Sequence, residues 1–275
     1  DLRRNHPALL LRFSGEDAFR TPTDSLFAVY DPIADFVDRF GTPDTVGIAT
    51  PQQVAERVML LRRRYPKIAL EGHFHNDRGL ALINAITAIQ AGMQYINTSI
   101  LGLAERSGIT PMTALVFNLY LDNPGILEGF DFSLSYPLNV LVADILRTLV
   151  PTTEPISLTN RTHTAGVHTG AVLKDATVYE AHPLQKFGVT EQRLLLGPLS
   201  GQHLIGYYLR EISYFEGISD DVAADISNEF KRRVSEINDL KSPRLLLEEI
   251  ALQNGLRKSS RATTANIEVL TNGGK

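Results

Sequence analysis

The first 121 residues alternate short apolar runs with longer segments in which apolar residues recur at helical spacing. This pattern predicts strands at about 8–13, 46–49, 68–75 and 95–100, and helices at about 25–40, 51–64, 79–91 and 111–121. Repeated strand-then-helix units favour an α/β fold with a parallel sheet connected by helices. A (β/α)8 barrel holds eight such units in about 250 residues. We therefore expect half a TIM barrel, with an open four-unit sheet as the alternative.

The alternation stops after residue 121, where turn-rich segments begin. Amphipathic helices are predicted at about 138–149, 204–215, 220–237 and 242–254, and a weakly structured tail at 258–275. We expect two domains: four β/α units in residues 1–121, and a mostly helical region in residues 122–275.

Composition narrows the classes of function. The chain has 27 Lys and Arg against 31 Asp and Glu, so it lacks the basic surplus typical of nucleic-acid binders. It has no cysteine, so any transition-metal site must use histidines and carboxylates. No apolar run approaches the roughly 18 residues of a membrane span, and residues 1–7 lack a signal peptide's apolar stretch. We expect a cytoplasmic protein without nucleic-acid or membrane partners.

The segment EGHFHND at residues 71–77 carries the strongest local signal. Side chains alternate across a strand, so Glu71, His73 and His75 point to one face. Two imidazoles at this spacing can chelate one divalent cation, and sheets of this type place their sites at the carboxyl ends of strands. Structural histidines bonded to the backbone are the alternative.

Polar side chains also lie at the end of the first predicted strand and at the start of the second. Arg12, Ser14 and Glu16 share a strand face, where an Arg can hold a substrate carboxylate bidentately and a Ser can support it. A solvated Arg–Glu pair is the alternative. Thr45, in the segment DTVGIATP, could donate a hydrogen bond to an anionic ligand or could simply begin a strand.

Two further clusters are less specific. Glu105 and Arg106, after the fourth predicted strand, could form an ion pair or a loop clamp. His168, in the segment THTAGVH, has the side chain best suited to acid–base catalysis near neutral pH, although a plain surface position is the alternative.

Taken in order, these five segments resemble the DRE-type metal-dependent TIM-barrel acyltransferases, the family of the homocitrate and isopropylmalate synthases. The segments are RFSGED, DTVGIATP, EGHFHND, NTSILGLAERSGIT and THTAGVH, and the likeness extends from about residue 10 to about residue 201. Their combination is more specific than any single motif. Arg12, Leu101 and the residues around His168 resemble the homocitrate synthase pattern more than the isopropylmalate synthase pattern. Ala104 departs from the family's usual glycine at that position.

The resemblance implies roles for individual residues. His73 and His75 would ligate a divalent metal cation, Zn, Mg or Mn. Arg12, Ser14 and Thr45 would bind a 2-oxoacid, and Glu16 would be a polar catalytic residue beside it. His168 would be a catalytic residue that reaches from an interface segment into the barrel of the partner subunit of a homodimer, near acetyl-CoA.

The resemblance also implies a reaction, the condensation of acetyl-CoA with 2-oxoglutarate to homocitrate and CoA. The alternatives are 2-isopropylmalate synthase or another 2-oxoacid condensing enzyme, and, outside enzymes, a half-barrel regulatory or scaffold subunit. A related acyl-CoA lyase is disfavoured because those lyases usually rely on a loop cysteine. The family's first four strands, with an acidic metal ligand, have no counterpart here. We therefore expect the C-terminal half of the barrel, with a preceding segment or a second chain supplying the rest.

Overall fold

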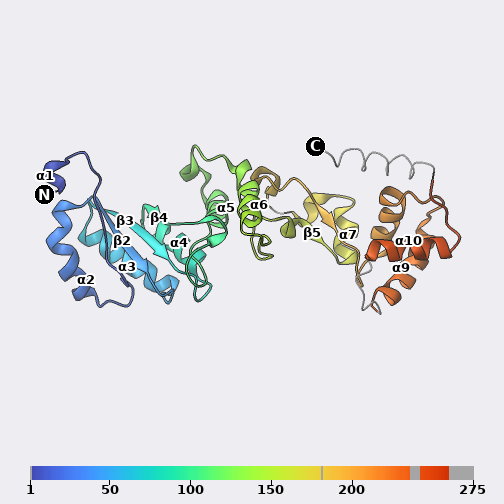
Figure 1. Ribbon diagram of the computed structural model, residues 1–275, viewed down its shortest axis with the longest axis horizontal. Helices are drawn as coiled ribbons and strands as arrows, with labels where there is room; N and C mark the ends of the chain where they lie inside the picture. The colour runs from blue at the N-terminus through green and yellow to red at the C-terminus, as the bar shows by residue number, and fades with distance from the viewer. Residues whose placement is uncertain (1, 181, 236–241, 260–275) are drawn as a thin grey trace. The chain divides into compact units, whose positions relative to one another are not determined.

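The structure is a computed structural model that describes residues 2–180, 182–235 and 242–259. The chain forms two compact units (Figure 1). The first contains residues up to Asn160 together with Lys186–Gly188, and the second contains Arg161–Gln185 and the residues from Val189 onward. Among the described residues, no helix is long and apolar enough to cross a membrane.

Four parallel strands form the sheet of the first unit, in the order β1-β2-β3-β4. The strands are β1 (Arg12–Ser14), β2 (Arg39–Asp44), β3 (Ala69–Phe74) and β4 (Tyr95–Ile96). The helices that follow them in turn are α2 (Thr23–Tyr30), α3 (Pro51–Arg64), α4 (Ala81–Gln90) and α5 (Met112–Asp122). This succession confirms the predicted half of a (β/α)8 barrel, and within the described residues the sheet is open rather than closed into a barrel.

The two faces of this sheet differ in chemistry. Phe40, Leu70 and Phe74 are fully buried and pack in one core with apolar residues of α3 and α4, the helices beside the strands in Figure 1. Residues of the other parity lie on the opposite face, where Arg12 pairs in register with Arg39. The apolar side chains of the strands point toward the helices, and the polar side chains therefore point to the opposite face.

The second strand is where the sequence-based prediction was wrong. Residues 25–40 were expected to be one helix and 46–49 a strand, but α2 ends at Tyr30, a 3-10 helix covers Asp31–Phe36, and β2 occupies Arg39–Asp44. Its sequence RFGTPD contains Gly, Pro and Asp, which are poor strand formers. Pro43 is tolerated because its backbone faces the side of β2 where β1 has already ended. On that side its carbonyl accepts a hydrogen bond from the amide of Ala18, and no strand-to-strand hydrogen bond requires an N–H at residue 43.

Other elements agree more closely with the prediction. Helix α3 has the predicted bounds, because Thr50 and Gln53 form a reciprocal capping box and Pro51 occupies the first helical position. Strand β3 and helices α4 and α5 lie within a few residues of their expected positions. Strand β4 is much shorter than expected and ends at Ile96.

The first unit includes elements beyond residue 121. Helix α6 (Ser135–Ile145) belongs to it, because Asn139 on α6 accepts a hydrogen bond from Thr113 Oγ1 on α5. Thr113 Oγ1 also lies 3.1 Å from the buried Glu154 carboxylate. Phe117 and Phe187 pack edge to face at 5.1 Å, which joins Lys186–Gly188 to this unit.

The second unit is mostly helical and has its own core. Its elements are β5 (Thr162–His163), α7 (Gly166–Val172), β6 (Arg193–Leu194), α8 (Gln202–Tyr207), a π-helix (Tyr208–Ile212), α9 (Asp220–Val234) and α10 (Pro243–Gln253). Helices α9 and α10 lie side by side (Figure 1), and Leu209, Phe230 and Leu247 are fully buried between its helices. Most of the predicted tail at 258–275 lies outside the described residues.

Several short helices complete the chain. They are α1 (Leu2–Asn5) and the 3-10 helices Ile100–Gly102, Pro124–Leu127, Phe132–Leu134, Leu158–Arg161, Ala176–Tyr179 and Leu184–Phe187.

Candidate active site

His73 and His75 lie at the carboxyl end of β3 on the polar face of the sheet, as the alternation of side chains predicts. Their Nε2 atoms face each other at 3.3 Å, and their rings are 4.9 Å apart at an interplanar angle of 62°. Two imidazole nitrogens bound at 2.0–2.1 Å to one tetrahedral ion are about 3.3 Å apart. The separation therefore fits two ligands of one metal ion.

The environment of these rings supports the same use. Nδ1 of His73 is 3.3 Å from Asn97 Oδ1, and because that oxygen only accepts, the contact favours the tautomer with the proton on Nδ1 and the lone pair on Nε2. Burial is the main reason that the pKa of His73 is lowered, which favours the neutral imidazole. Nδ1 of His75 is buried without a hydrogen-bond partner among the described residues. In that part of the chain, no group of three or more His, Asp or Glu side chains is placed to hold a metal.

Arg12 and Ser14 belong to β1, and their side chains lie over Gly41 of the neighbouring strand β2. A Cβ atom at Gly41 would be 2.6 Å from Ser14 Oγ and 2.7 Å from Arg12 Nη2. The absence of a side chain at residue 41 therefore lets Arg12 reach over β2 toward β3.

Arg12 forms an ion pair with the carboxylate of Glu71, whose side chain is only 4% exposed. Glu71 Oε1 accepts from Arg12 Nε at 2.7 Å, and Oε2 accepts from Arg39 Nη1 at 2.9 Å. Burial raises the pKa of Glu71, but the hydrogen bonds from Arg39 and Arg12 outweigh it, so the pKa is lowered and the carboxylate stays charged. The guanidinium carbon of Arg39 lies 3.4 Å from the centre of the Tyr95 ring.

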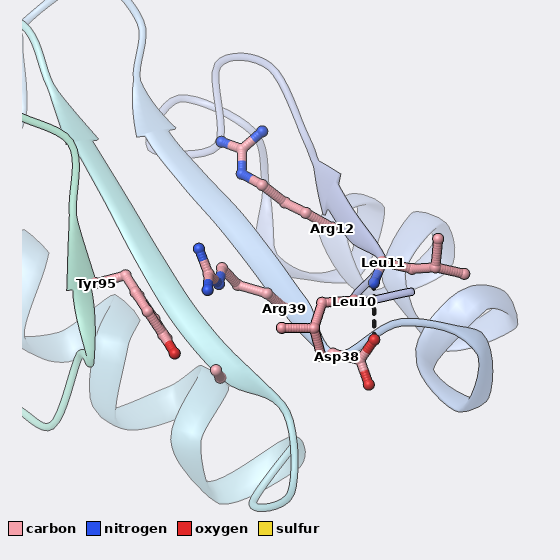
Figure 2. A pocket seen from close by; sticks show the side chains of 7 residues that line it. Leu10, Leu11, Arg12, Asp38, Arg39 and Tyr95 are labelled. Carbon is pink, nitrogen blue, oxygen red and sulfur yellow. Dashed lines mark hydrogen bonds between the residues drawn. The ribbon is translucent and has the colours of Figure 1, made fainter. Parts of the chain in front are cut away.

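A cavity of about 220 Å³ lies beside this group of charges. Figure 2 shows Arg12 and Arg39 extending from neighbouring strands, with the Tyr95 ring next to Arg39. The lining residues are Leu10, Leu11, Arg12, Asp38, Arg39, Ala69 and Tyr95.

Thr45 and Glu16 lie in the loops that follow β2 and β1. Thr45 Oγ1 accepts from the amide of Asp17 at 2.8 Å, which leaves its hydroxyl hydrogen free to donate to a ligand. Glu16 is exposed in the turn after β1.

Arg106 acts as a clamp between loops, although its partner is Asp77 rather than the expected Glu105. Its Nε and Nη2 donate to the two carboxylate oxygens of Asp77 at 2.7 and 2.9 Å, and Nη2 also donates to the carbonyl of Thr45 at 2.8 Å. Gly47, at φ 62°, is part of the same contact, because a Cβ atom there would be 2.6 Å from Asp77 Oδ2. The loops after β2, β3 and β4 are thus joined at one ion pair.

His168 lies in the second unit, on helix α7, with an exposed side chain. Its ring packs at 4.4 Å from the ring of Tyr179. The other predicted site residues all belong to the first unit.

Sequence reasoning missed Arg39, Gly41 and Tyr95. All three lie on the polar face because of the register of β2 and β4 with β3, in which Gly41 and Tyr95 both pair with Glu71. The misplaced second strand hid the first two. No signal in the sequence links Asn97, the first residue of the segment NTSILGLAERSGIT, to His73.

Comparisons with known proteins place the chain in a family. Residues 4–141, half of the chain, match a family model described as HMGL-like, and residues 158–237 match one described as homocitrate synthase post-HMGL domain-like. A mitochondrial homocitrate synthase of Schizosaccharomyces pombe is 37% identical over 198 residues, which cover 71% of this chain and 47% of that protein. A 2-isopropylmalate synthase of Pyrococcus abyssi is 30% identical over an alignment of 280 positions, gaps included, which covers 96% of this chain and 57% of that protein.

A solved structure of an HMG-CoA lyase from Acinetobacter baumannii, in complex with coenzyme A and 3-methylmalate, overlaps 55% of this chain and 53% of that chain. The identity is 20% and the TM-score 0.48, which is too low to bear on function. The chain spans about half the length of the curated relatives it matches. On the match over residues 4–141 and the homocitrate and isopropylmalate synthases among its relatives, the chain belongs to the HMGL-like family.

Proposed function

We propose that the protein condenses acetyl-CoA with 2-oxoglutarate and releases homocitrate and CoA. The relatives that carry the name homocitrate synthase support this reaction. The observation that carries the proposal is the free end of the Arg12 guanidinium, on the sheet face that also holds His73 and His75. Glu71 occupies only the Nε and Nη2 side of Arg12, and no described residue hydrogen-bonds Nη1.

The spacing along β3 fits a dicarboxylic oxoacid. Arg12 is bound at Glu71, two residues before His73 on the same face. A rise of about 3.3 Å per residue gives about 7 Å between those positions along the strand. An oxoacid with its keto end at the imidazoles can therefore present its second carboxylate to Arg12. An apolar oxoacid would leave that charge unpaired.

We propose His73 and His75 as the residues that hold a divalent cation, Zn, Mg or Mn, through Nε2. The separation of these atoms and the Asn97 contact fit that role. When bound, the cation would supply positive charge that polarises the keto carbonyl of the oxoacid.

The chain's own residues would bind substrate and move protons. The free hydroxyl hydrogen of Thr45 and the hydroxyl of Ser14 can donate to the oxoacid, and Glu16 is our candidate for a polar catalytic residue beside it. We propose His168 as the base that removes a proton from the acetyl methyl group. The methyl carbon then bonds to the keto carbon, the keto oxygen gains a proton, and water cleaves the thioester to release CoA.

We also propose that the active form is a cytoplasmic homodimer in which His168 of one chain serves the site of its partner. A second candidate reaction, 2-isopropylmalate synthesis, is favoured by the Pyrococcus abyssi relative, whose similarity extends over 96% of this chain. It would use an apolar 2-oxoacid instead.

Replacing Arg12 tests the choice between these reactions. Arg12→Ala should raise the KM for 2-oxoglutarate roughly 10- to 100-fold, the size expected for a lost charged hydrogen bond. The KM for acetyl-CoA should stay near its wild-type value. Arg64→Ala, which removes an Arg paired with Asp31 away from the site, is the control. A wild-type protein that prefers 2-oxoisovalerate would refute the 2-oxoglutarate assignment.

A further inference from the structure

Glu71 is a buried carboxylate to which the proposed reaction gives no role. It carries one negative charge between two guanidinium groups, so the three side chains have a net charge of +1. A buried ion pair adds little to stability compared with apolar packing.

The three side chains differ in how freely they can move. Glu71 is 4% exposed and receives hydrogen bonds on both of its oxygens, whereas the Arg12 side chain is 43% exposed. Arg39 is fixed from a second direction by the Tyr95 ring, 3.4 Å from its guanidinium carbon. The carboxylate is thus held from the Arg39 side and presents Oε1 to Arg12 as a fixed acceptor.

The hydrogen bond and the ion-pair contact with Glu71 use one particular edge of Arg12. Oε1 of Glu71 is 2.7 Å from Nε and 2.6 Å from Nη2, which form the side edge of the planar guanidinium. The end edge, Nη1 with the second hydrogen of Nη2, can still take a carboxylate bidentately. Holding the side edge fixes the plane and direction of the end edge.

We propose that Glu71 is a positioning residue that aims the free end of Arg12 at the distal carboxylate of the oxoacid, with Arg39 and Tyr95 holding Glu71 in place. This role rests on the proposed function, because it needs an oxoacid with a second carboxylate. The excess positive charge of the three residues makes the site selective for an anionic end group. The orientation of Arg12 makes it selective for an oxoacid of one length.

The test separates positioning from simple support of the fold. Glu71→Gln removes the charge that holds Arg12 but leaves two neighbouring guanidinium groups, which threatens folding. The double variant Glu71→Gln with Arg39→Gln restores the net charge of +1 and so provides the second variant. Glu154→Gln is the matched control, because Glu154 is another buried carboxylate of the same unit, away from the polar face.

We expect both Glu71 variants to raise the KM for 2-oxoglutarate roughly tenfold, as a misdirected binding group does. The KM for acetyl-CoA and the Tm of the double variant should stay near wild type, and Glu154→Gln should change neither KM. Equal increases in both KM values, or an unchanged KM for 2-oxoglutarate in a folded Glu71 variant, would overturn the positioning role.

A second measurement is independent of substrate. The Nε–H of Arg12 should give a slowly exchanging NMR signal that disappears in both Arg12→Lys and Glu71→Gln. If that signal behaves so but the wild type does not use 2-oxoglutarate, the contact is correct and the proposed function is wrong. If the wild type uses 2-oxoglutarate but lacks the signal, the positioning role is wrong and the proposed function stands.

Discussion

His73 and His75 turn one ring nitrogen each toward the other, and their remaining nitrogens have different surroundings. Nδ1 of His73 faces Asn97, whereas Nδ1 of His75 is buried without a partner among the described residues. The orientation of His73 is therefore set by Asn97, the residue that follows β4, while that of His75 depends on its backbone and on packing.

Metal binding should depend on these contacts in a graded way. His73→Ala and His75→Ala should each remove most bound divalent metal, measured as metal per chain by mass spectrometry. Asn97→Ala should weaken binding roughly 10- to 100-fold, because it frees the ring that Asn97 orients. Burial lowers the pKa of His73 below the ordinary imidazole value of about 6.5. Protons should therefore compete with the metal for His73 only at pH values below that ordinary value. Full metal occupancy in the double histidine variant would refute the assignment.

The sequence predicts this part of the site well, because the pairing of His73 with His75 depends only on the alternation along a single strand. It cannot predict the partners of Arg12 in the same way. Its side-chain partner Glu71 lies 59 residues further along the chain, and Arg39, its neighbour in register, lies 27 residues along. Their meeting depends on the register of three strands. Nothing local in the sequence specifies that register.

Strand β2 shapes the site because residue 41, a glycine, has no side chain. The sequence suggested that Gly41 ends a helix, but Gly41 lies inside the strand, between Ser14 of β1 and Glu71 of β3. Helix α3 was predicted correctly because its capping box is encoded within four consecutive residues. Strand β2 was not, because its stability comes from neighbours on both sides rather than from its own residue preferences.

Adding one carbon atom at Gly41 should therefore disturb binding. Gly41→Ala places a methyl group 2.7 Å from Arg12 Nη2, so the flexible Arg12 side chain must move away from Glu71, and 2.9 Å from Ser14 Cβ, which can move only with its backbone. We expect a higher KM for 2-oxoglutarate and a lower Tm. Gly197→Ala is the control, since a Cβ atom there meets nothing within 4 Å. If Gly41→Ala binds 2-oxoglutarate as tightly as wild type, then Arg12 does not need the path across β2.

At the scale of the whole molecule, the chain divides into two compact units after Asn160. Strand–helix alternation ends near residue 121, whereas α6 belongs to the first unit through contacts such as the one between Thr113 and Asn139, which are not visible as periodicity. The division leaves His168 in one unit and the remaining predicted site residues in the other.

This separation suggests a complementation test of the proposed dimer. A His168→Ala chain and a His73→Ala chain should each be nearly inactive as homodimers, in the form of the protein whose wild type is active. In a statistical mixture, half of the dimers combine the two chains and each has one intact site, so about a quarter of wild-type activity should return. No recovery, with mixed dimers confirmed by mass, would mean that His168 does not act across the interface.

The ion pair of Asp77 with Arg106 has a consequence for engineering. It joins three loops through two side chains and one carbonyl, so none of those loops is an independent module. A loop grafted from a relative would fail unless it kept the glycine at 47, the carboxylate at 77 and the guanidinium at 106 together. For the same reason, amide hydrogen exchange in these loops should follow one shared opening event instead of three separate rates.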